Sequence, residues 1–419
     1  MSRSGVSSPT VTSRQPGPAT RDRRPRLAVT AVFVANGLLF ASWTAHIPHV
    51  MRHLRLTDAT LGFALLGAPV GSVMAMVLAS YLLPRFGSRR VVRVALVGYC
   101  AAGPLVGLTG SPAALFGALF LWGAFQGTLD VAMNTQAIAV ERADRRALMS
   151  GLHAGWSIGS VTGAGIGALA VSVGLDLTPQ LLILGTIALL AAGLLTSRML
   201  PDAVGRVNAE QPATGDTLSV SRWSGGMMLL GGIAFAGMLC EGASADWASV
   251  YLSGPLRATG AVPGLGYAAF AFAMLTVRLS GNRLLNRFRP SHLLPALAAL
   301  GAVGFAGGLA VGRPVAAIAG FAALGIGMAS VVPAVFSASG RVAGLHPGTA
   351  IATVSACGWA GFVCGPPLIG HIASLTSLPL ALGLIPLLTA LVAVGTLVSP
   401  TLQGTPPPHP SPAGWDGMR

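Results

Sequence analysis

Three polar side chains stand four residues apart in the otherwise apolar stretch 113–139: Gln126, Asp130 and Asn134. Residues four apart lie on one face of an α-helix, so the three predict a polar stripe. An ionised carboxylate at the centre of a bilayer costs about 3 kcal/mol even on lenient insertion scales, so in a membrane helix Asp130 must face a cavity or a partner. Burial also favours the neutral form of a carboxyl group, which suits Asp130 to carry a proton. The alternative is a carboxylate locked to an arginine or the backbone to fix helix packing.

A second apolar stretch contains Glu241 and Asp246, in the sequence Cys-Glu-Gly-Ala-Ser-Ala-Asp-Trp. Five residues apart, they are expected to point in different directions on one helix. Glu241 lies deeper in the stretch, and we expect it to bind substrate or a proton. Asp246 precedes Trp247, an aromatic residue typical of membrane interfaces. For Asp246 we therefore weigh gating or helix-end packing equally with substrate contact.

Two histidines and two tryptophans complete the candidate site. Histidine titrates near neutral pH, so His153 and His46 could join a proton relay, although hydrogen bonding at a helix end explains each equally well. Trp156 and Trp359 could stack on a ring of the substrate, and packing of the bundle interior explains them equally well.

The composition decides which elements must position these residues. The chain has 419 residues, of which 53% are hydrophobic and 9% are charged, whereas soluble proteins carry roughly 25% charged residues. The excess apolar sequence must face lipid, which excludes soluble enzymes and nucleic-acid binders. All 26 basic residues are arginine, so a lysine-containing phosphate-binding loop is absent. We predict no catalytic residues, no metal site and no cofactor.

Twelve apolar segments are long enough to cross a membrane as helices, which needs about 20 residues each. The first six are 27–47, 61–83, 91–109, 113–139, 150–172 and 179–197. The second six are 226–252, 262–280, 291–311, 315–338, 349–372 and 378–398. We predict an N-terminal half over 27–197, a polar cytoplasmic linker over 198–224 and a C-terminal half over 225–398. Residues 1–26 and 399–419 are predicted disordered cytoplasmic tails.

The arginines predict the orientation. With both termini in the cytoplasm, 22 arginines fall on the cytoplasmic side and four fall outside, namely Arg52, Arg55, Arg257 and Arg313. Basic residues favour the cytoplasmic side. We therefore expect a multi-pass protein of the plasma (inner) membrane with N-in and C-in topology.

The two halves resemble each other in sequence. Tyr81-Leu-Leu-Pro-Arg-Phe86 matches Arg283-Leu-Leu-Asn-Arg-Phe288, and Gly155-Trp156 matches Gly358-Trp359 at nearly the same offset. Two duplicated six-helix halves indicate a transporter with its substrate site between them near the bilayer midplane. A row of glycines four residues apart, from Gly151 to Gly167, suits either a moving interface between halves or static helix packing.

The loop after the second segment, Ser80-Tyr-Leu-Leu-Pro-Arg-Phe-Gly-Ser-Arg-Arg90, resembles the signature between helices two and three of the major facilitator superfamily. That signature reads Gly-x-Leu-x-Asp-Arg-x-Gly-Arg-Arg; Leu82, Arg85, Gly87 and Arg89 match it, and Pro84 stands where the family has Asp. The resemblance implies twelve helices in two halves and a gating loop. To that gate we assign Arg85, Gly87, Arg89, Arg90, Asp246 and the repeat-related Arg283.

The stretch from Gln126 to Gln136, with Asp130 followed four positions later by Asn134, resembles the fourth helix of the fucose-permease-like proton symporters. In that group the acidic residue takes part in proton coupling and sugar transport, which the resemblance assigns here to Asp130. The group also has an acidic residue in helix one, where this chain offers Asn36 and, near the helix end, His46.

These observations predict a secondary active transporter, proton-coupled, that moves a small polar and sugar-like solute by alternating access. The alternative is a proton-driven efflux antiporter for a drug or secondary metabolite. An intramembrane enzyme would need a polar catalytic cluster, which the sequence does not offer. A non-transporting sensor would not need carboxylates at the midplane, so Asp130 and Glu241 favour the transporter. Expected partners are the solute, protons and the lipid bilayer, with the protein acting as a monomer.

Overall fold

The computed structural model describes residues 23–144, 148–201, 224–288, 290–342, 345 and 347–403, which form helices and no strands. The N-terminal half contains α1 (Arg24–Ser42), η1 (Thr44–His46), α2 (Ile47–His53), α3 (Asp58–Leu65), α4 (Gly67–Phe86), α5 (Ser88–Val106), α6 (Pro112–Asp144), α7 (Met149–Ser172), α8 (Leu177–Ala188), η2 (Leu189–Gly193) and η3 (Thr196–Arg198). The C-terminal half contains α9 (Gly225–Ser253), α10 (Val262–Arg287), α11 (Pro290–Val311), α12 (Pro314–Met328), α13 (Val331–Ser339), α14 (Pro347–Leu375), α15 (Leu378–Leu382), α16 (Leu384–Val398) and α17 (Pro400–Gln403).

Each of the twelve predicted segments corresponds to helix in the structure, and some consist of two or three consecutive helices. Among the described residues, 11 helical stretches are long and apolar enough to cross a membrane. The predicted segment that is not among these 11 is 91–109, which corresponds to α5, whose first two turns carry Arg89, Arg90 and Arg93. These charges make α5 less apolar than the other spans. Most of the predicted linker and tails, at 1–22, 202–223 and 404–419, lies outside the described residues.

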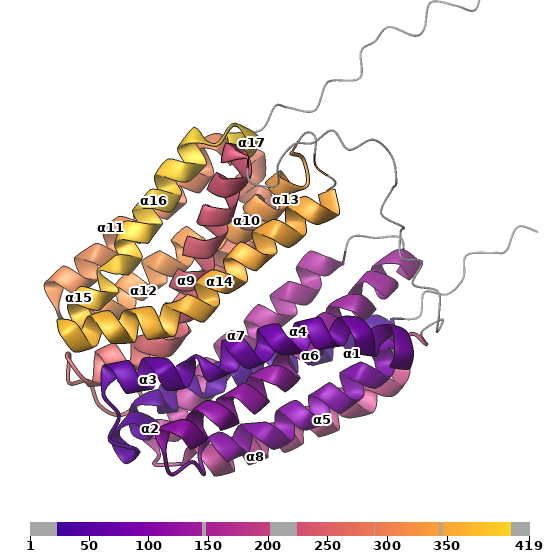
Figure 1. Ribbon diagram of the computed structural model, residues 1–419, viewed down its shortest axis with the longest axis horizontal. Coiled ribbons are helices and arrows are strands. Elements are labelled where there is room, and N and C mark those ends of the chain that lie inside the picture. The colour runs from indigo at the N-terminus through magenta and orange to yellow at the C-terminus, as the bar shows by residue number, and fades with distance from the viewer. Residues whose placement is uncertain are drawn as a thin grey trace, which may run out of the picture.

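Helix packing repeats between the halves. In the N-terminal half α1 packs on α7, α4 on α6 and α5 on α8. The equivalent pairs in the C-terminal half are α9 with α14, α10 with α12 and α11 with α16. Figure 1 shows the two groups of helices as separate bundles lying side by side. The repeated pairing is the structural counterpart of the internal duplication in the sequence.

The glycine row of α7 packs within its own half. A Cβ added at Gly159, Gly163 or Gly167 would meet the α1 backbone, at the carbonyl oxygens of Val34, Leu38 and Ser42 respectively. Small residues on one face let two membrane helices approach closely. The row therefore joins α7 to α1, and static packing is the reading that the contacts support.

The two halves meet at one end of the bundle. We call the end that carries Arg24, Arg198 and Gln403 the linker face and the opposite end the distal face. Across the halves, α3 packs on α14 and α7 on α10. Near the distal face, the Ser249 hydroxyl on α9 donates to the carbonyl oxygen of Thr44 at 2.6 Å. In Figure 1 the halves separate from the distal face toward the linker face, where α13 and α17 lie.

Candidate functional site

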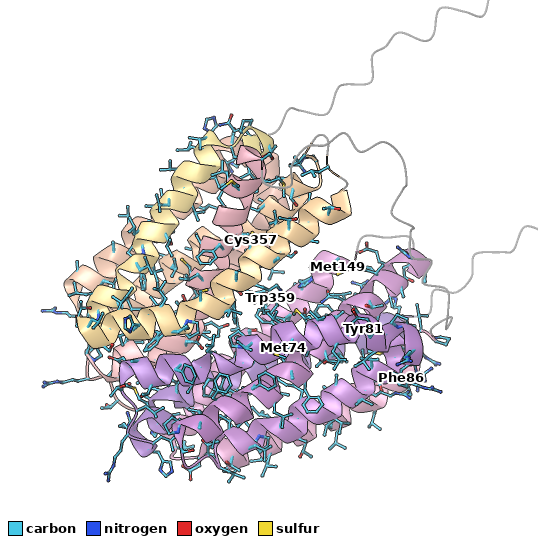
Figure 2. The ribbon with its side chains drawn as sticks, viewed as in Figure 1. Met74, Tyr81, Phe86, Met149, Cys357 and Trp359 are labelled. Carbon is cyan, nitrogen blue, oxygen red and sulfur yellow. The ribbon has the colours of Figure 1, made fainter. Side chains whose placement is uncertain are left out.

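A cavity of about 320 Å³ lies between the halves and is lined by both. From the N-terminal half it takes Phe40, Trp43, Leu65, Ala68, Pro69, Ser72, Tyr99, Trp122, Gly123, Gln126, Asp130, Met133, His153 and Trp156. From the C-terminal half it takes Met238, Glu241, Asp246, Tyr267, Arg278, Val332, Phe336, Trp359 and Phe362. Figure 2 shows Trp359 on α14 at the level where the two halves approach each other. A site shared by both halves is the arrangement that alternating access requires.

The structure brings seven of the predicted site residues to this one cavity. They come from α6, α7, α9 and α14 and are Gln126, Asp130, His153, Trp156, Glu241, Asp246 and Trp359. Their side chains therefore lie around a common space although up to 233 positions separate them in the chain. What each one does there remains a prediction.

The predicted polar stripe on α6 forms one wall. The Asn134 Nδ2 donates to the Asp130 backbone oxygen at 2.8 Å and to its carboxylate Oδ1 at 3.3 Å. The Ser72 hydroxyl on α4 lies 2.8 Å from the Gly123 carbonyl oxygen and 3.0 Å from Gln126 Oε1. Asn134 itself does not line the cavity. Its amide instead orients the Asp130 carboxylate, while Ser72 orients Gln126.

The C-terminal half supplies two more carboxylates. Glu241 and Asp246 on α9 both line the cavity, as does Tyr267 of α10. The two acids thus reach one cavity from positions five residues apart on α9, and Asp246 lies away from the predicted gating loop. Within its own half α9 packs against α14, α10 and α13, and it also contacts α2 and η1 of the N-terminal half.

Arg278 is a cavity residue that the sequence reasoning missed. Its Nε donates to the Ala329 carbonyl oxygen at 3.2 Å, and its NH1 donates to the Ser157 hydroxyl at 3.4 Å across the halves. Counting arginines for topology assigned it to the cytoplasmic side. The available signal was an ionisable residue within the apolar segment 262–280, which by itself marks a functional position.

Aromatic rings cover much of the remaining wall. Phe40 lies 6.1 Å from Trp156 and 6.4 Å from Tyr267, measured between ring centroids. On the opposite side Trp359 contacts Phe362 at 5.7 Å. The cavity thus offers ring faces from both halves for stacking on a solute.

A deeper aromatic group in the N-terminal half contains Tyr99, Trp43 and Trp122. The indole Nε1 of Trp122 donates to the Tyr99 carbonyl oxygen at 3.1 Å, and the two rings stack at 5.3 Å. The Tyr99 side chain is 1% exposed, and its hydroxyl has no hydrogen-bond partner among the described residues. Sequence reasoning gave no reason to single out Tyr99.

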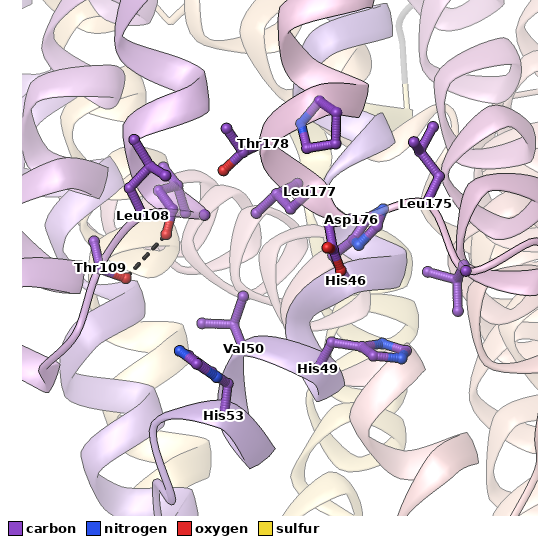
Figure 3. Close-up of a pocket in the computed structure, with 15 residues that line it drawn as sticks. His46, His49, Val50, His53, Leu108, Thr109, Leu175, Asp176, Leu177 and Thr178 are labelled. Atoms are coloured by element: carbon purple, nitrogen blue, oxygen red, sulfur yellow. Dashed lines mark hydrogen bonds between the residues drawn. The ribbon is translucent and has the colours of Figure 1, made fainter.

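Besides Asn134, the predicted residues Asn36 and His46 do not line the cavity. Asn36 is fully buried on α1, where its Nδ2 contacts the Met133 sulfur at 3.8 Å. His46 lines a second pocket of about 550 Å³ at the distal face, with His49, His53 and Asp176 (Figure 3). Its Nε2 lies 2.8 Å from Gln180 Oε1. The two histidines of the predicted relay are therefore in separate pockets.

The predicted gating loop lies at the linker face. Gly87 joins α4 to α5 with a positive φ of +77°, which glycine adopts without the steric cost that other residues bear. Arg85 and Arg90 are exposed, and an Arg89 guanidinium nitrogen donates to the Ser197 carbonyl oxygen at 2.6 Å. Arg283 is helical, and its side chain lies outside what the structure describes. The loop thus connects helices of one half at the face opposite the close contacts between halves.

The arrangement offers acid–base and binding chemistry. Within the described residues no three His, Cys, Asp or Glu side chains are grouped as metal ligands. The cavity instead combines carboxylates, one guanidinium, one imidazole and aromatic faces. Such a set can exchange protons and bind a polar solute.

Comparison with known proteins agrees with this architecture. Residues 28–251 match the sequence family described as the Major Facilitator Superfamily. An uncharacterized MFS-type transporter of Yersinia pestis is 36% identical over 363 residues, covering 87% of this chain and 92% of that protein. A variant of the nucleoside transporter NupG superimposes with a TM-score of 0.72 at 12% identity, covering 89% of this chain and 99% of that one. The MFS transporter FucP, in its outward conformation, gives a TM-score of 0.57 at 15% identity, covering 88% and 97%.

Proposed function

Because the chain belongs to the Major Facilitator Superfamily, whose members are membrane transporters, we propose that it couples the entry of a small polar solute to the entry of protons. Secondary transport by alternating access follows from the family and the fold. The symport of protons and the sugar-like character of the solute are our proposals. The observation that carries them is the cavity shared by both halves, in which Asp130 of α6 stands opposite Glu241 and Asp246 of α9.

Asp130 is proposed as the proton carrier. An ionised carboxylate in an apolar bundle is costly, so loading with a proton or with solute removes the penalty that would oppose movement of the halves. The Asn134 amide holds the carboxylate near the cavity wall at 3.3 Å. Gln126 is proposed as a solute contact, and Trp156 and Trp359 as stacking faces.

The side of the membrane to which the cavity opens follows from the orientation of the protein. We place both termini in the cytoplasm of a plasma-membrane protein, because most arginines then lie on the cytoplasmic side. The linker face is then cytoplasmic, and contacts at the distal face close the outside. In this orientation the structure represents an inward-facing state. We propose that one copy suffices, because each half already packs around a complete central site.

Purified protein in liposomes that contain a pH-sensitive dye tests the proposal. A sugar or small polar solute added outside should acidify the lumen as it enters, because protons accompany it. Alkalinisation on solute entry would instead establish the antiporter. No dye response to any solute, in vesicles with protein of verified fold, would refute proton coupling.

Asp130→Asn provides the residue-level test. The amide cannot carry a proton, so solute-driven acidification should fall to the protein-free background while the protein stays folded in the membrane. Asp144→Asn, at the linker-face end of the same helix and outside the cavity, is the matched control and should transport normally. Normal pH-dependent accumulation by the Asp130 variant would rule out its role as carrier.

A further inference from the structure

The wall of the central cavity carries more negative than positive charge. Among the described residues that line it, three carboxylates, when ionised, exceed one guanidinium by two unit charges. The titratable and charged groups on this wall are Asp130, Glu241, Asp246, Arg278, His153, Tyr99 and Tyr267. In a site of low dielectric an uncompensated charge is costly, and the cost is removed when a carboxylate takes up a proton or binds a ligand of opposite sign.

The excess charge is concentrated on α9. Within the described part of the chain, neither Glu241 nor Asp246 accepts a hydrogen bond or pairs with a cationic side chain, and both line the cavity. Arg278 is engaged elsewhere, because its guanidinium donates to Ala329 and Ser157 at 3.2 and 3.4 Å. The α9 carboxylates are therefore available to a ligand.

A second observation places ligand contact on the other side of the cavity. Only 1% of the Tyr99 surface is exposed, and its hydroxyl has no hydrogen-bond partner among the described residues. Tyr99 is nevertheless one of the residues that line the cavity. Buried polar groups are hydrogen-bonded in the great majority of cases. A phenol hydroxyl both donates and accepts, so it suits a hydroxyl or an amino group of a solute.

Aromatic residues line the same cavity as the carboxylates. Tyr267 lines the cavity together with Glu241 and Asp246. Its ring centroid is 6.4 Å from that of Phe40, which in turn lies 6.1 Å from that of Trp156. A cation over an aromatic face gains on the order of 0.5–2 kcal/mol. A protonated amine near α9 would thus meet both carboxylates and ring faces.

We propose that the transported solute is a small organic cation, with a protonated amino group held by Glu241 and Asp246 and a hydrogen-bonding group that reaches Tyr99. This inference rests on the proposed function, since it treats the cavity as the solute site. The cavity volume of about 320 Å³ lies at the lower end of the range of volumes of small-molecule binding sites. Asp130, on the opposite wall, keeps the role of proton carrier.

Matched pairs of solutes that differ in one group test the proposal. Glucosamine against glucose, and tyramine against tyrosol, each exchange an amino group for a hydroxyl at nearly constant size. Binding to the purified full-length protein at pH 7 is measured by tryptophan fluorescence and isothermal calorimetry. The amine of at least one pair should bind tenfold or more tightly than its neutral partner. Equal or tighter binding of the neutral partners, or failure of both amines to bind, would overturn the proposal.

Variants then locate the charge recognition. Glu241→Gln and Asp246→Asn keep the side-chain size and should each reduce the preference for the amine to about twofold or less. Asp144→Asn should leave the preference unchanged, because Asp144 lies outside the cavity. Monodispersity in detergent checks that each variant is folded. If a variant misfolds, the comparison of amines with their neutral partners on the wild-type protein still tests the proposed solute class. An undiminished preference in both well-folded variants would refute the assignment to α9.

The outcome is separable from that of the proton-coupling test. If amines bind but no solute moves protons, the solute class stands and the coupling fails. If glucose or tyrosol drives lumen acidification as well as its amine, proton symport stands and the cationic class fails.

Discussion

Replacing Gly370 by alanine should open the distal face. Gly370 on α14 faces Gly62 on α3 across the two halves, and an added Cβ would lie 2.5 Å from the Asp58 carbonyl oxygen and 3.1 Å from the Gly62 Cα. Both obstacles are backbone atoms, which cannot rotate away. Ordinary contact begins at 3.4 Å, so the two helices must separate by about 0.9 Å at this point.

The size of the effect follows from this overlap. Overpacking a close contact costs typically about 1–3 kcal/mol. The cost falls on the state in which the distal face is closed, because the contact is broken when the halves separate there. A difference of this size changes the ratio of the two states by about 5- to 150-fold. The variant should therefore populate the state that is open at the distal face, with transport slowed because the closed state is disfavoured.

Distance measurements between spin labels give the readout. Labels at Arg52→Cys and Arg313→Cys, both exposed near the distal face and on different halves, report its opening in a background that lacks the native cysteines. The distance distribution should shift to longer values in Gly370→Ala. Gly165→Ala is the control, because a Cβ there meets nothing within 4 Å. An unchanged distribution in Gly370→Ala, or an equal shift in the control, would refute this reasoning.

Three further substitutions test contacts that the structure shows. Ser249→Ala removes a buried hydrogen bond of 2.6 Å across the halves and should weaken distal closure by about 0.5–1.5 kcal/mol. The distance between the same spin labels should shift in the same direction as in Gly370→Ala, but by less. Gln180→Leu leaves His46 without its 2.8 Å partner and should lower stability by about 1–3 kcal/mol, seen as a lower melting temperature; an unchanged value would contradict it. Arg278→Gln removes the only permanent cation among the described residues of the cavity wall and should tighten amine binding several-fold in calorimetry. Weaker binding would show that the guanidinium supports the solute.

The sequence alone determined the class of protein, the twelve segments and the principal candidates. Apolar length and spacing are local properties, so segment positions can be read without knowledge of neighbours. The same holds for Asp130 and Glu241, because an acid in an apolar segment is conspicuous wherever the helix packs. The resemblance of the loop around Gly87 added the superfamily, which the comparisons confirm.

Tertiary structure decided which of these residues meet. Asn36 and Asp130 are both polar residues in apolar segments, yet one is enclosed between helices of its own half and the other lines the cavity. The direction that a residue faces depends on how its helix is rotated against its neighbours, and the apolar sequence around it is compatible with many rotations. For the same reason Tyr99 emerged only from the packed structure, whereas Arg278, an ionisable residue in an apolar segment, could have been found from the sequence. The glycine row of α7 could have joined helices within one half or across the two, because small residues permit close approach without specifying the partner. Backbone contacts with α1 decided this question in favour of one half.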